Sequence, residues 1–458
     1  MSAGPGAVGI AHHGPVGDPE PARPEPAAGE GDLFELLSEG ARPRQETAWF
    51  VPGRIEVLGK HTDYAGGRSL LAAVDRGHTV TARRREDRLI VVTSGAAEDE
   101  VVLDLAAPGA RDDDGSGHWS GYVRTVVDRL DANFPGLLVG ADITITSTLP
   151  LAAGMSSSSA LVVGLTLALI DLTGIAAEPA FRAAITTPEQ LGEYLGTVEN
   201  GQTYGSLGGH RGVGTFGGSE DHTSMLCGRS DALVQYSFCP VRHERTVPFP
   251  QDLALVVAVS GIDAAKTGAA RDAYNRVSLA AWELIDRWRV DTGRRDDRVL
   301  ADALASGVAA RGRLVEYAGD DEYLRGRLEQ FIAESERLVP AAALALEERD
   351  LEELGRLVDE SQRGAEEGLG NQVPETVDLQ RIARELGALA ASAFGAGFGG
   401  SVWALVPTGS AEQFAQQWLD LYRTRHPHAA GRSSVLVTRP GSCAHRVDVQ
   451  PGGAQRHQ

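Results

Sequence analysis

Cysteines and long apolar runs are scarce in this sequence, and both shortages restrict the kind of protein it encodes. Its 458 residues include three cysteines, too few and too scattered for a disulfide framework or a zinc site: Cys227, Cys239 and Cys443. No apolar stretch approaches the roughly 20 residues that span a bilayer. No basic segment followed by an apolar one marks a signal peptide near the start. We therefore expect a cytoplasmic protein without a membrane partner.

Positive charge is also in short supply. The chain has 43 Lys and Arg against 63 Asp and Glu, for a formal net charge of −20. Binding to a nucleic-acid backbone requires clustered Lys and Arg, so nucleic acid is not an expected partner. The length allows two or three domains with a substantial core, and 42% of the residues are hydrophobic.

The two ends of the chain contain little that can be buried. Residues 1–31 are rich in Gly, Pro, Ala and Glu, and residues 440–458 have a similar composition. Such segments cannot offset the entropy lost on ordering, so both are predicted to be disordered tails. Ordered structure is expected to begin near Asp32.

A strand followed by a serine-rich helix start is the clearest local signal. Residues 141–149 alternate apolar and polar side chains, as in a half-buried strand, and Pro150 ends that pattern. Gly154 permits a tight turn before four serines, 156–159, and apolar side chains then recur at helical spacing. A helix N-terminus exposes unpaired N–H groups, so the segment predicts a phosphate site. A simple serine cap is the alternative, but one cap requires only one serine.

A second polar cluster lies between two apolar strands. After strand residues 55–58 come Gly59 and then Lys60, His61, Asp63 and Tyr64, before an apolar run resumes at Leu70. Sugar hydroxyls are recognised by paired hydrogen bonds from such donors and acceptors. A solvated turn and half of a metal site are the alternatives.

A third segment contains Gly395, Gly397 and Gly400, which satisfy the pattern GxGxxG. A dinucleotide site would require a strand before these glycines and a helix after them. The apolar spacing instead predicts a helix over 379–394 and a strand over 401–407. No GxxxxGK[ST] occurs, so a P-loop is excluded as well.

The remaining pattern mixes helices and strands. Strands are predicted over 76–103, 253–259 and 434–440, and helices over 117–134, 188–199 and 411–424, with a mostly helical stretch from 276 to 362. We therefore predict the α+β class.

Three segments resemble motifs of the GHMP kinase superfamily, in that family's order. GRIEVLGKHTDYAGG (53–67) resembles the galactokinase sugar signature GRxNxxGEHTDYxxG. PLAAGMSSSSA (150–160) resembles PxxxGLSSSA, and SAFGAGFGGSVWALV (392–406) resembles the third motif. The resemblance implies a two-domain α+β GHMP kinase fold, with domains at 32–240 and 241–439 and the active site in the cleft between them.

The implied activity is transfer of the ATP γ-phosphoryl group, with Mg²⁺, to the anomeric hydroxyl of galactose or a related small-molecule sugar, by a monomer. Asp221 would orient or deprotonate the hydroxyl, and Arg54 would lower the pKa of Asp221 and steady the transferring charge. The resemblance assigns sugar binding to Lys60, His61, Asp63, Gly218 and Tyr274. It assigns ATP binding to Gly154, Met155, Ser156, Ser157, Ser158 and Gly397, and Mg²⁺ binding to Ser158 and Glu199.

The chain departs from the family pattern between its second and third motifs. A glycine-rich insertion, 200–217, lengthens the segment from Glu199 to Asp221, and Glu220 and His222 replace the family's Met and Gln. Glu193 therefore remains an alternative to Glu199 as the metal ligand.

Lys60 is the sharpest departure, because the family has Glu there, and Glu56 stands where the family has Asn. Lys60 can only donate hydrogen bonds. Either its side chain turns to solvent and galactose remains the substrate, or it pairs with a carboxylate or phosphate on a charged sugar. A catalytically silent sugar sensor is a further alternative, although the serines and Asp221 are intact. A kinase for mevalonate or homoserine is another, although HTDY would then be unused.

Overall fold

A computed structural model describes residues 30–38, 41–97, 99–107, 119–150, 154–262 and 268–449 of the chain. Within these ranges, helices and two separate sheets form a mixed structure, which confirms the predicted α+β class. No helix within these ranges is both long and apolar enough to cross a membrane.

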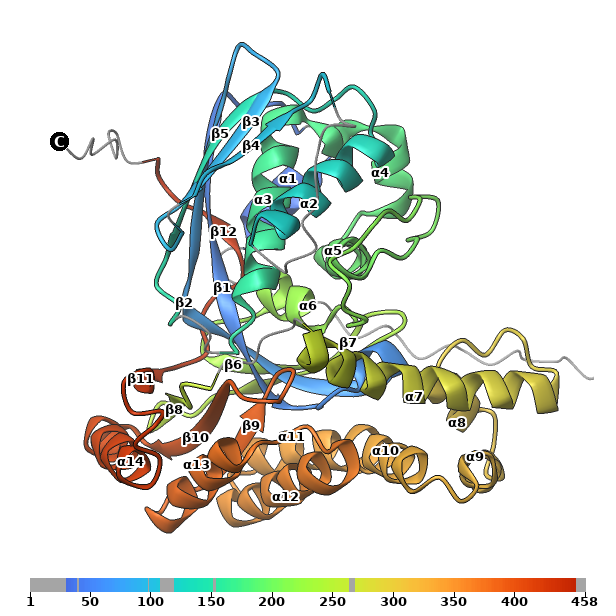
Figure 1. Cartoon of the computed structure of the whole chain (residues 1–458), viewed down its shortest axis with the longest axis vertical. Coiled ribbons are helices and arrows are strands. Elements are labelled where there is room, and N and C mark those ends of the chain that lie inside the picture. The colour runs from blue at the N-terminus through green and yellow to red at the C-terminus, as the bar shows by residue number, and fades with distance from the viewer. Residues whose placement is uncertain are drawn as a thin grey trace, which may run out of the picture.

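The larger sheet has eight strands; β3, β4 and β5 lie near the top of Figure 1, and β6 and β7 lie lower, near the second sheet. Its order is β12-β1-β2-β5-β3-β4, and β6 and β7 continue it from β2. All pairs are antiparallel except β3 with β5. The strands are β1 (Glu46–Leu58), β2 (Arg68–Arg84), β3 (Leu89–Ser94), β4 (Val101–Asp104), β5 (Ala141–Ser147), β6 (Ala232–Ser237), β7 (Arg242–Pro248) and β12 (His445–Arg446).

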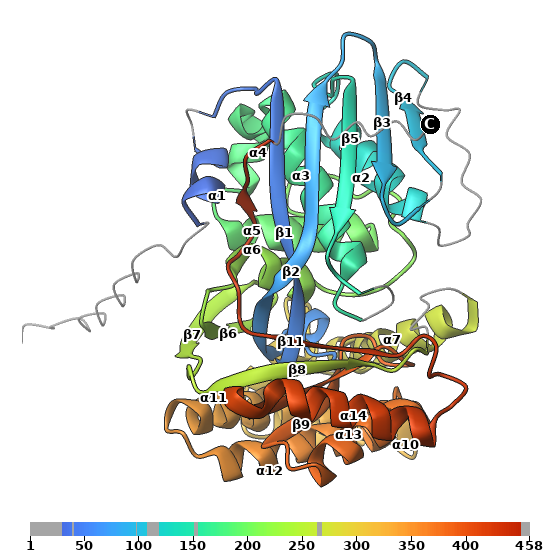
Figure 2. The same ribbon diagram turned by 90° about the vertical axis from the view of Figure 1, so that its left-hand side faces the viewer.

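Helices cover one face of this sheet (Figure 2). They are α1 (Glu30–Leu36), α2 (Trp119–Asn133), α3 (Ser157–Thr173), α4 (Pro179–Ala184), α5 (Pro188–Asn200) and α6 (Glu220–Cys227). The central helix α3 is buried along its whole length from Ser159 to Leu172. Gly164 lets α3 approach the sheet closely, since a Cβ there would lie 2.5 Å from Val80 Cγ2. The helix after the serines is therefore held rigidly.

The smaller sheet, in the lower half of Figure 1, has the order β11-β8-β10-β9. Its strands are β8 (Leu253–Val259), β9 (Ala390–Phe394), β10 (Ser401–Pro407) and β11 (Ser434–Thr438). The helices of this half are α7 (Gly268–Thr292), α8 (Leu300–Ala305), α9 (Ala310–Ala318), α10 (Glu322–Ala333), α11 (Val339–Glu347), α12 (Leu351–Arg363), α13 (Pro374–Glu385) and α14 (Ala411–Arg425).

Alternate side chains of β8 enter two different cores, as the pleat of a strand requires. Val256 packs with apolar residues of α13 and α14. Val257 packs with residues of α11 and α12, in a cluster that also contains Ile55 of β1 and Leu70 of β2. One apolar core therefore spans both halves of the chain and holds them together.

The prediction for the segment before the glycine loop was wrong. The helix predicted over 379–394 ends at Glu385, and residues 390–394 form β9 instead. Gly387 takes a left-handed conformation (φ 92°) after the helix, and the small side chains that follow are buried against β10. The glycines therefore follow a strand, but a strand also comes after them, so the exclusion of a dinucleotide fingerprint stands.

The C-terminal segment predicted to be disordered is ordered through residue 449. His445 and Arg446 form β12 and pair with Phe50 and Trp49 of β1. Arg446 Nη2 also lies 2.7 Å from Oδ1 of the buried Asp171. This ion pair, the strand pairing and backbone hydrogen bonds such as Ala444 N to Met225 O order the segment despite its composition. Residues 1–29 and 450–458 of the two predicted tails lie outside the described residues.

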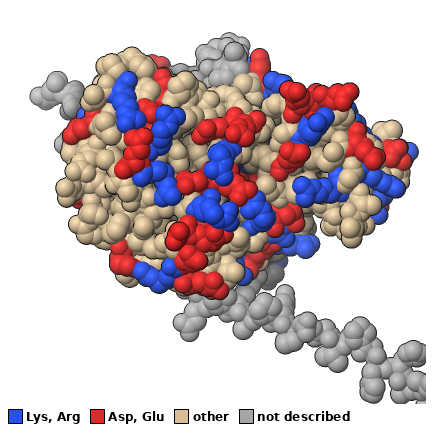
Figure 3. Space-filling model, turned by 90° about the horizontal axis from the view of Figure 1, so that it is seen from below, with Lys and Arg blue, Asp and Glu red and all other residues tan. Residues whose placement is uncertain are grey.

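The surface carries acidic and basic side chains side by side. Figure 3 shows this on the face seen from below, where the helices of the C-terminal half lie. Ion pairs in this half include Arg356 with Glu353, Arg384 with Asp359 and Arg349 with Asp252.

Candidate active site

A cavity of about 390 Å³ lies where segments from both halves of the chain meet. The first strand and its turn supply Arg54, Glu56, His61, Asp63 and Tyr64, and the serine turn supplies Gly154 and Ser156 to Ser159. Other lining residues are Glu199, Gly218, Glu220, Asp221 and His222, with Tyr274 of α7 and the glycine loop from Gly395 to Gly400. The glycine-rich insertion contributes Val213, Thr215 and Gly217.

Arg54 and Asp221 form a buried ion pair in this cavity. Arg54 Nε lies 2.6 Å from Asp221 Oδ1, and Arg54 Nη1 donates to Gly154 O at 2.8 Å. Burial opposes the charge on Arg54, but Asp221, Glu220 and Glu56 together raise its pKa. The guanidinium therefore stays charged and holds one oxygen of Asp221 in place.

The serine turn holds the other oxygen of Asp221. Ser156 Oγ donates to Asp221 Oδ2 at 2.5 Å. Ser156 has φ 55° and ψ 46°, a left-handed conformation that is uncommon for a residue other than glycine. Ser159 Oγ donates to Glu199 Oε2 at 2.9 Å and lies 3.4 Å from Asp221 Oδ2. The start of α3 is thus tied to both carboxylates.

The glycine loop packs directly against the serine turn. A Cβ at Gly395 would lie 3.1 Å from Gly154 O, and a Cβ at Gly397 would lie 2.4 Å from Asn371 O. Ser157 and Ser158 border the cavity at the first turn of α3, where unpaired N–H groups favour an anion. Met155 is the exception among the predicted ATP residues. Its side chain is buried in the apolar core and does not line the cavity.

The predicted metal ligands fit Mg²⁺ in their chemistry. Ser158 and Glu199, the two predicted ligands, supply oxygen atoms, which Mg²⁺ prefers, and both line the cavity beside the oxygen atoms of Ser159 and Asp221. Glu193 does not line it, because its carboxylate accepts from Val241 N at 2.7 Å and Tyr204 Oη at 3.2 Å. Of the two glutamates, Glu199 is therefore the one whose carboxylate is available to a metal in the cavity.

Four of the five predicted sugar residues line the cavity together. The His61 and Tyr274 rings lie 5.5 Å apart between centroids. Asp63 Oδ2 accepts from Glu220 N at 3.1 Å, and a Cβ at Gly218 would lie 2.4 Å from the same oxygen. Only glycine leaves room for that carboxylate. Burial raises the pKa of both Asp63 and Tyr274, and it keeps Tyr274 a neutral hydrogen-bond donor.

Lys60, the fifth predicted sugar residue, does not line the cavity, so that prediction and the prediction of a solvent-exposed side chain were both wrong. Only 1% of Lys60 is exposed, and its Nζ donates to Ser361 Oγ at 2.9 Å. Ser361 Oγ in turn donates to Glu334 Oε1 at 2.8 Å, and that oxygen also accepts from Gly59 N at 2.8 Å. Helices of the C-terminal half thus supply partners that hold Lys60 inside the protein.

Two buried carboxyl groups beside the Arg54–Asp221 pair were not predicted as site residues. Glu56 lines the cavity, and burial raises its pKa to about 7 despite the nearby charges of Lys60 and Arg54. Glu220 accepts from Ser69 Oγ at 2.6 Å, and burial, with Glu56 and Asp63 nearby, raises its pKa as well. The sequence did contain a signal for these two residues, because positions 56, 60 and 220 all depart from the family pattern. Lys60 offsets part of the acidic charge that Glu56 and Glu220 bring.

Three parts of the chain match described protein families. Residues 121–201 match the GHMP kinases N terminal domain, residues 342–424 match GHMP kinases C terminal, and residues 39–84 match the galactokinase galactose-binding signature. A galactokinase of Chloroflexus aurantiacus is 30% identical over 379 residues, which cover 82% of this chain and 87% of that protein. A galactokinase of Roseiflexus sp. (strain RS-1) is 29% identical over 422 residues, covering 91% of this chain and 97% of that protein.

Solved structures show the same fold. The crystal structure of Lactococcus lactis galactokinase complexed with galactose has a TM-score of 0.72 at 23% identity, covering 90% of this chain and 98% of that one. Methanococcus jannaschii mevalonate kinase has a TM-score of 0.53 at 14% identity, covering 86% and 98%. The fold and the matched segments are those of the GHMP kinases, which are ATP-dependent phosphotransferases. Within that class, the chain belongs to the galactokinase family and is a sugar kinase of that type.

Proposed function

We propose that the protein transfers the γ-phosphoryl group of ATP to the anomeric hydroxyl of galactose, giving galactose 1-phosphate. The buried pair of Arg54 and Asp221 is the observation that carries this proposal. The pair lines the cavity together with the residues of the sugar signature and with the serine turn. A sugar hydroxyl bound beside His61 and Asp63 would therefore meet the Asp221 carboxylate and a phosphate at the start of α3.

Positioning and charge neutralisation are the main requirements of phosphoryl transfer. Asp221 orients the attacking hydroxyl and accepts its proton, while Arg54 keeps the carboxylate in place and steadies the developing negative charge. N–H groups of the serine turn hold the phosphates, and the glycine loop closes the cavity behind them. Ser158 and Glu199 would hold Mg²⁺, which would neutralise negative charge on the phosphates.

The side chains that meet the sugar are His61, Asp63 and Tyr274. The buried Asp63 carboxyl lies against Gly218, where there is no side chain to cover it. Tyr274 borders the same cavity with a hydroxyl whose pKa is raised by burial. Lys60 points away from the cavity, and no lysine of the described residues lines it, which supports a neutral sugar.

A panel of sugars tests the proposal. ATP consumption is measured with galactose, other free hexoses, galacturonate and 6-phosphorylated sugars, and the product is identified by ³¹P NMR. We expect the highest kcat/KM for galactose and a 1-phosphate product. A tenfold preference for another sugar, or a phosphate at another carbon, would overturn the assignment. ATP loss without any sugar phosphate would support a different role for the cavity.

We further propose that the enzyme works as a cytoplasmic monomer without nucleic-acid or membrane partners. Light scattering during gel filtration tests the monomer, for which the mass should match the 48.4 kDa of one chain.

A further inference from the structure

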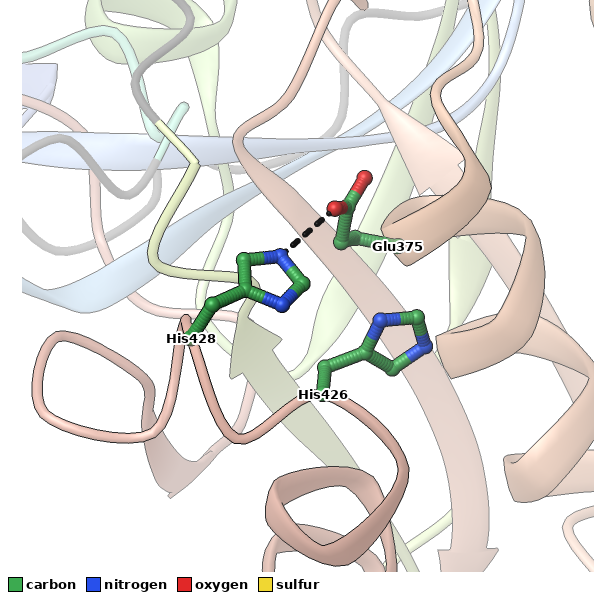
Figure 4. A group of neighbouring side chains, drawn as sticks. All are labelled: Glu375, His426 and His428. Carbon is green, nitrogen blue, oxygen red and sulfur yellow. Dashed lines mark hydrogen bonds and ion pairs between the residues drawn. The ribbon is translucent and has the colours of Figure 1, made fainter.

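A second cluster of ligand-type side chains lies on the surface of the C-terminal half. Glu375, His426 and His428 each offer one ligand atom, and these atoms all lie within 4.8 Å of one another. Figure 4 shows the carboxylate and the two imidazole rings turned toward a common space. No other group of three His, Cys, Asp or Glu residues in the described part of the chain has this geometry.

Two segments of the chain meet at this cluster. Glu375 lies in the first turn of α13, and His426 follows the last residue of α14. Pro427 stands between the two histidines and fixes its own φ near −65°. The backbone between the two rings is therefore already restricted, so less conformational freedom is lost when an ion binds.

His426 has the partners of a metal-binding histidine. Its Nε2 lies 2.9 Å from Asp378 Oδ2, and its ring stacks on Tyr422 with centroids 4.9 Å apart and planes inclined by 27°. A carboxylate that accepts the proton of one ring nitrogen leaves the lone pair of the other, here Nδ1, free to bind a metal. The tautomer and the ring orientation are therefore set before an ion arrives.

His428 and Glu375 already lie nearly as far apart as two ligands of the same metal ion. Nε2 of His428 is 2.9 Å from Oε1 of Glu375. Metal–ligand bonds of about 2.0–2.1 Å place two ligands of a tetrahedral Zn²⁺ roughly 3.3 Å apart. An ion can thus replace the shared proton with a small movement. The His428 side chain is 59% exposed, which leaves room for a water ligand.

The charges around the cluster do not repel a cation. Arg381 and Arg425 approach Asp378 at 3.4 and 3.2 Å, and Arg425 also pairs with Glu385 at 2.9 Å. Three carboxylates, those of Glu375, Asp378 and Glu385, therefore face two guanidinium groups.

We propose that Glu375, His426 and His428 bind a transition-metal ion of the Zn²⁺ type, with Asp378 as the positioning residue for His426. Imidazole nitrogens select such ions over Mg²⁺, so this site differs from the oxygen-lined site in the cavity. The ion ties the start of α13 to the end of α14. The ion also stabilises the contact between the glycine loop and the segment just before α13. In that contact the backbone oxygen of Asn371 accepts a hydrogen bond from Phe398 N at 2.6 Å.

Metal titration of the full chain tests the site. After treatment with EDTA and desalting, the protein is titrated with Co²⁺ and Zn²⁺ without nucleotide. We expect one equivalent to bind with a Kd on the order of micromolar or tighter, an intense visible Co²⁺ band of low coordination number, and a higher thermal midpoint. His428→Ala should weaken binding at least tenfold, and the exposed His243→Ala on β7 should leave it unchanged.

His428 is exposed, so the variant should fold like wild type, as circular dichroism can verify. Binding in the millimolar range, or a Co²⁺ spectrum typical of six oxygen ligands, would overturn the proposal. Equal affinity in wild type and His428→Ala would place the ion elsewhere and would also overturn it. Magnesium dependence of the kinase reaction has no bearing on any of these outcomes.

Discussion

Arg54 Nε donates to Asp221 Oδ1 across 2.6 Å, which joins the middle of β1 to the first turn of α6. The side chains are 4% and 20% exposed, so little water competes with the bond. Removing one partner of such a buried pair leaves a charge without compensation, which typically costs about 3–5 kcal/mol. A variant at this pair should therefore be shown to fold before its activity is compared.

Asp221→Asn keeps the shape of the side chain but removes the charge that accepts the proton. We expect kcat to fall by at least about 10²-fold, the lower range for a positioned acid–base group. ATP affinity, measured by isothermal titration calorimetry, should change little, because the serine turn remains. Near-wild-type turnover in the variant would exclude Asp221 as the group that activates the hydroxyl.

The serines at the start of α3 should differ in their effect on metal dependence. Ser158→Ala should raise the Mg²⁺ concentration for half-maximal activity by about tenfold, the effect expected of a lost metal-site group. Ser159→Ala should have a smaller effect, because its hydroxyl would orient Glu199 rather than bind the ion. A larger loss in Ser159→Ala would identify Ser159, which already contacts Glu199, as the metal ligand in place of Ser158.

Lys60→Met should mainly affect stability. The variant removes one of the two cations near the buried Glu56 and breaks the hydrogen bond from Lys60 Nζ to Ser361, so we expect the free energy of unfolding to fall by about 3–5 kcal/mol. Arg83→Met is the control, because Arg83 is a cation whose side chain is 70% exposed. Urea denaturation compares the two variants.

The substrate preference of the folded Lys60→Met enzyme is a separate test. The ranking of galactose above galacturonate and 6-phosphorylated sugars should be the same as in wild type, since Lys60 does not line the cavity. A loss confined to charged sugars would show that Lys60 reaches the substrate.

Glu56→Gln should change how stability depends on pH. Glu56 has an ordinary pKa of 4.5, and burial raises it to about 7 in the folded protein. Between these values the folded state holds a proton that the unfolded state has released, so this contribution to stability is lost as pH rises from about 4.5 to 7.

Gln cannot ionise, so the variant should gain stability over wild type at pH 8, by on the order of 3 kcal/mol at most, and gain none near pH 4.5. Urea denaturation at several pH values measures the difference, with the exposed Glu46→Gln as control. An identical pH profile in Glu56→Gln and wild type would show that folding does not raise the pKa of Glu56.

Local chemistry explains the parts of the fold that could be predicted. Gly154, the four serines and the glycines of 395–400 have conformational and hydrogen-bonding properties that depend on few neighbours. The apolar run 253–259 formed β8 over the predicted residues. Residues 390–394 did not follow their local pattern, because pairing with β10 outweighs the helix preference of alanine.

The class of the protein and the segments that form its site follow from local sequence, because the glycines, serines and HTDY cluster act through groups adjacent in the chain. The directions of the charged side chains depend instead on contacts between distant segments. Lys60 turns inward because Ser361, 301 residues later, accepts a hydrogen bond from its Nζ and in turn donates to the buried Glu334. Arg446 orders the end of the chain because Asp171 is buried without another strong cation as close. Burial makes such charges depend on partners that no local pattern specifies.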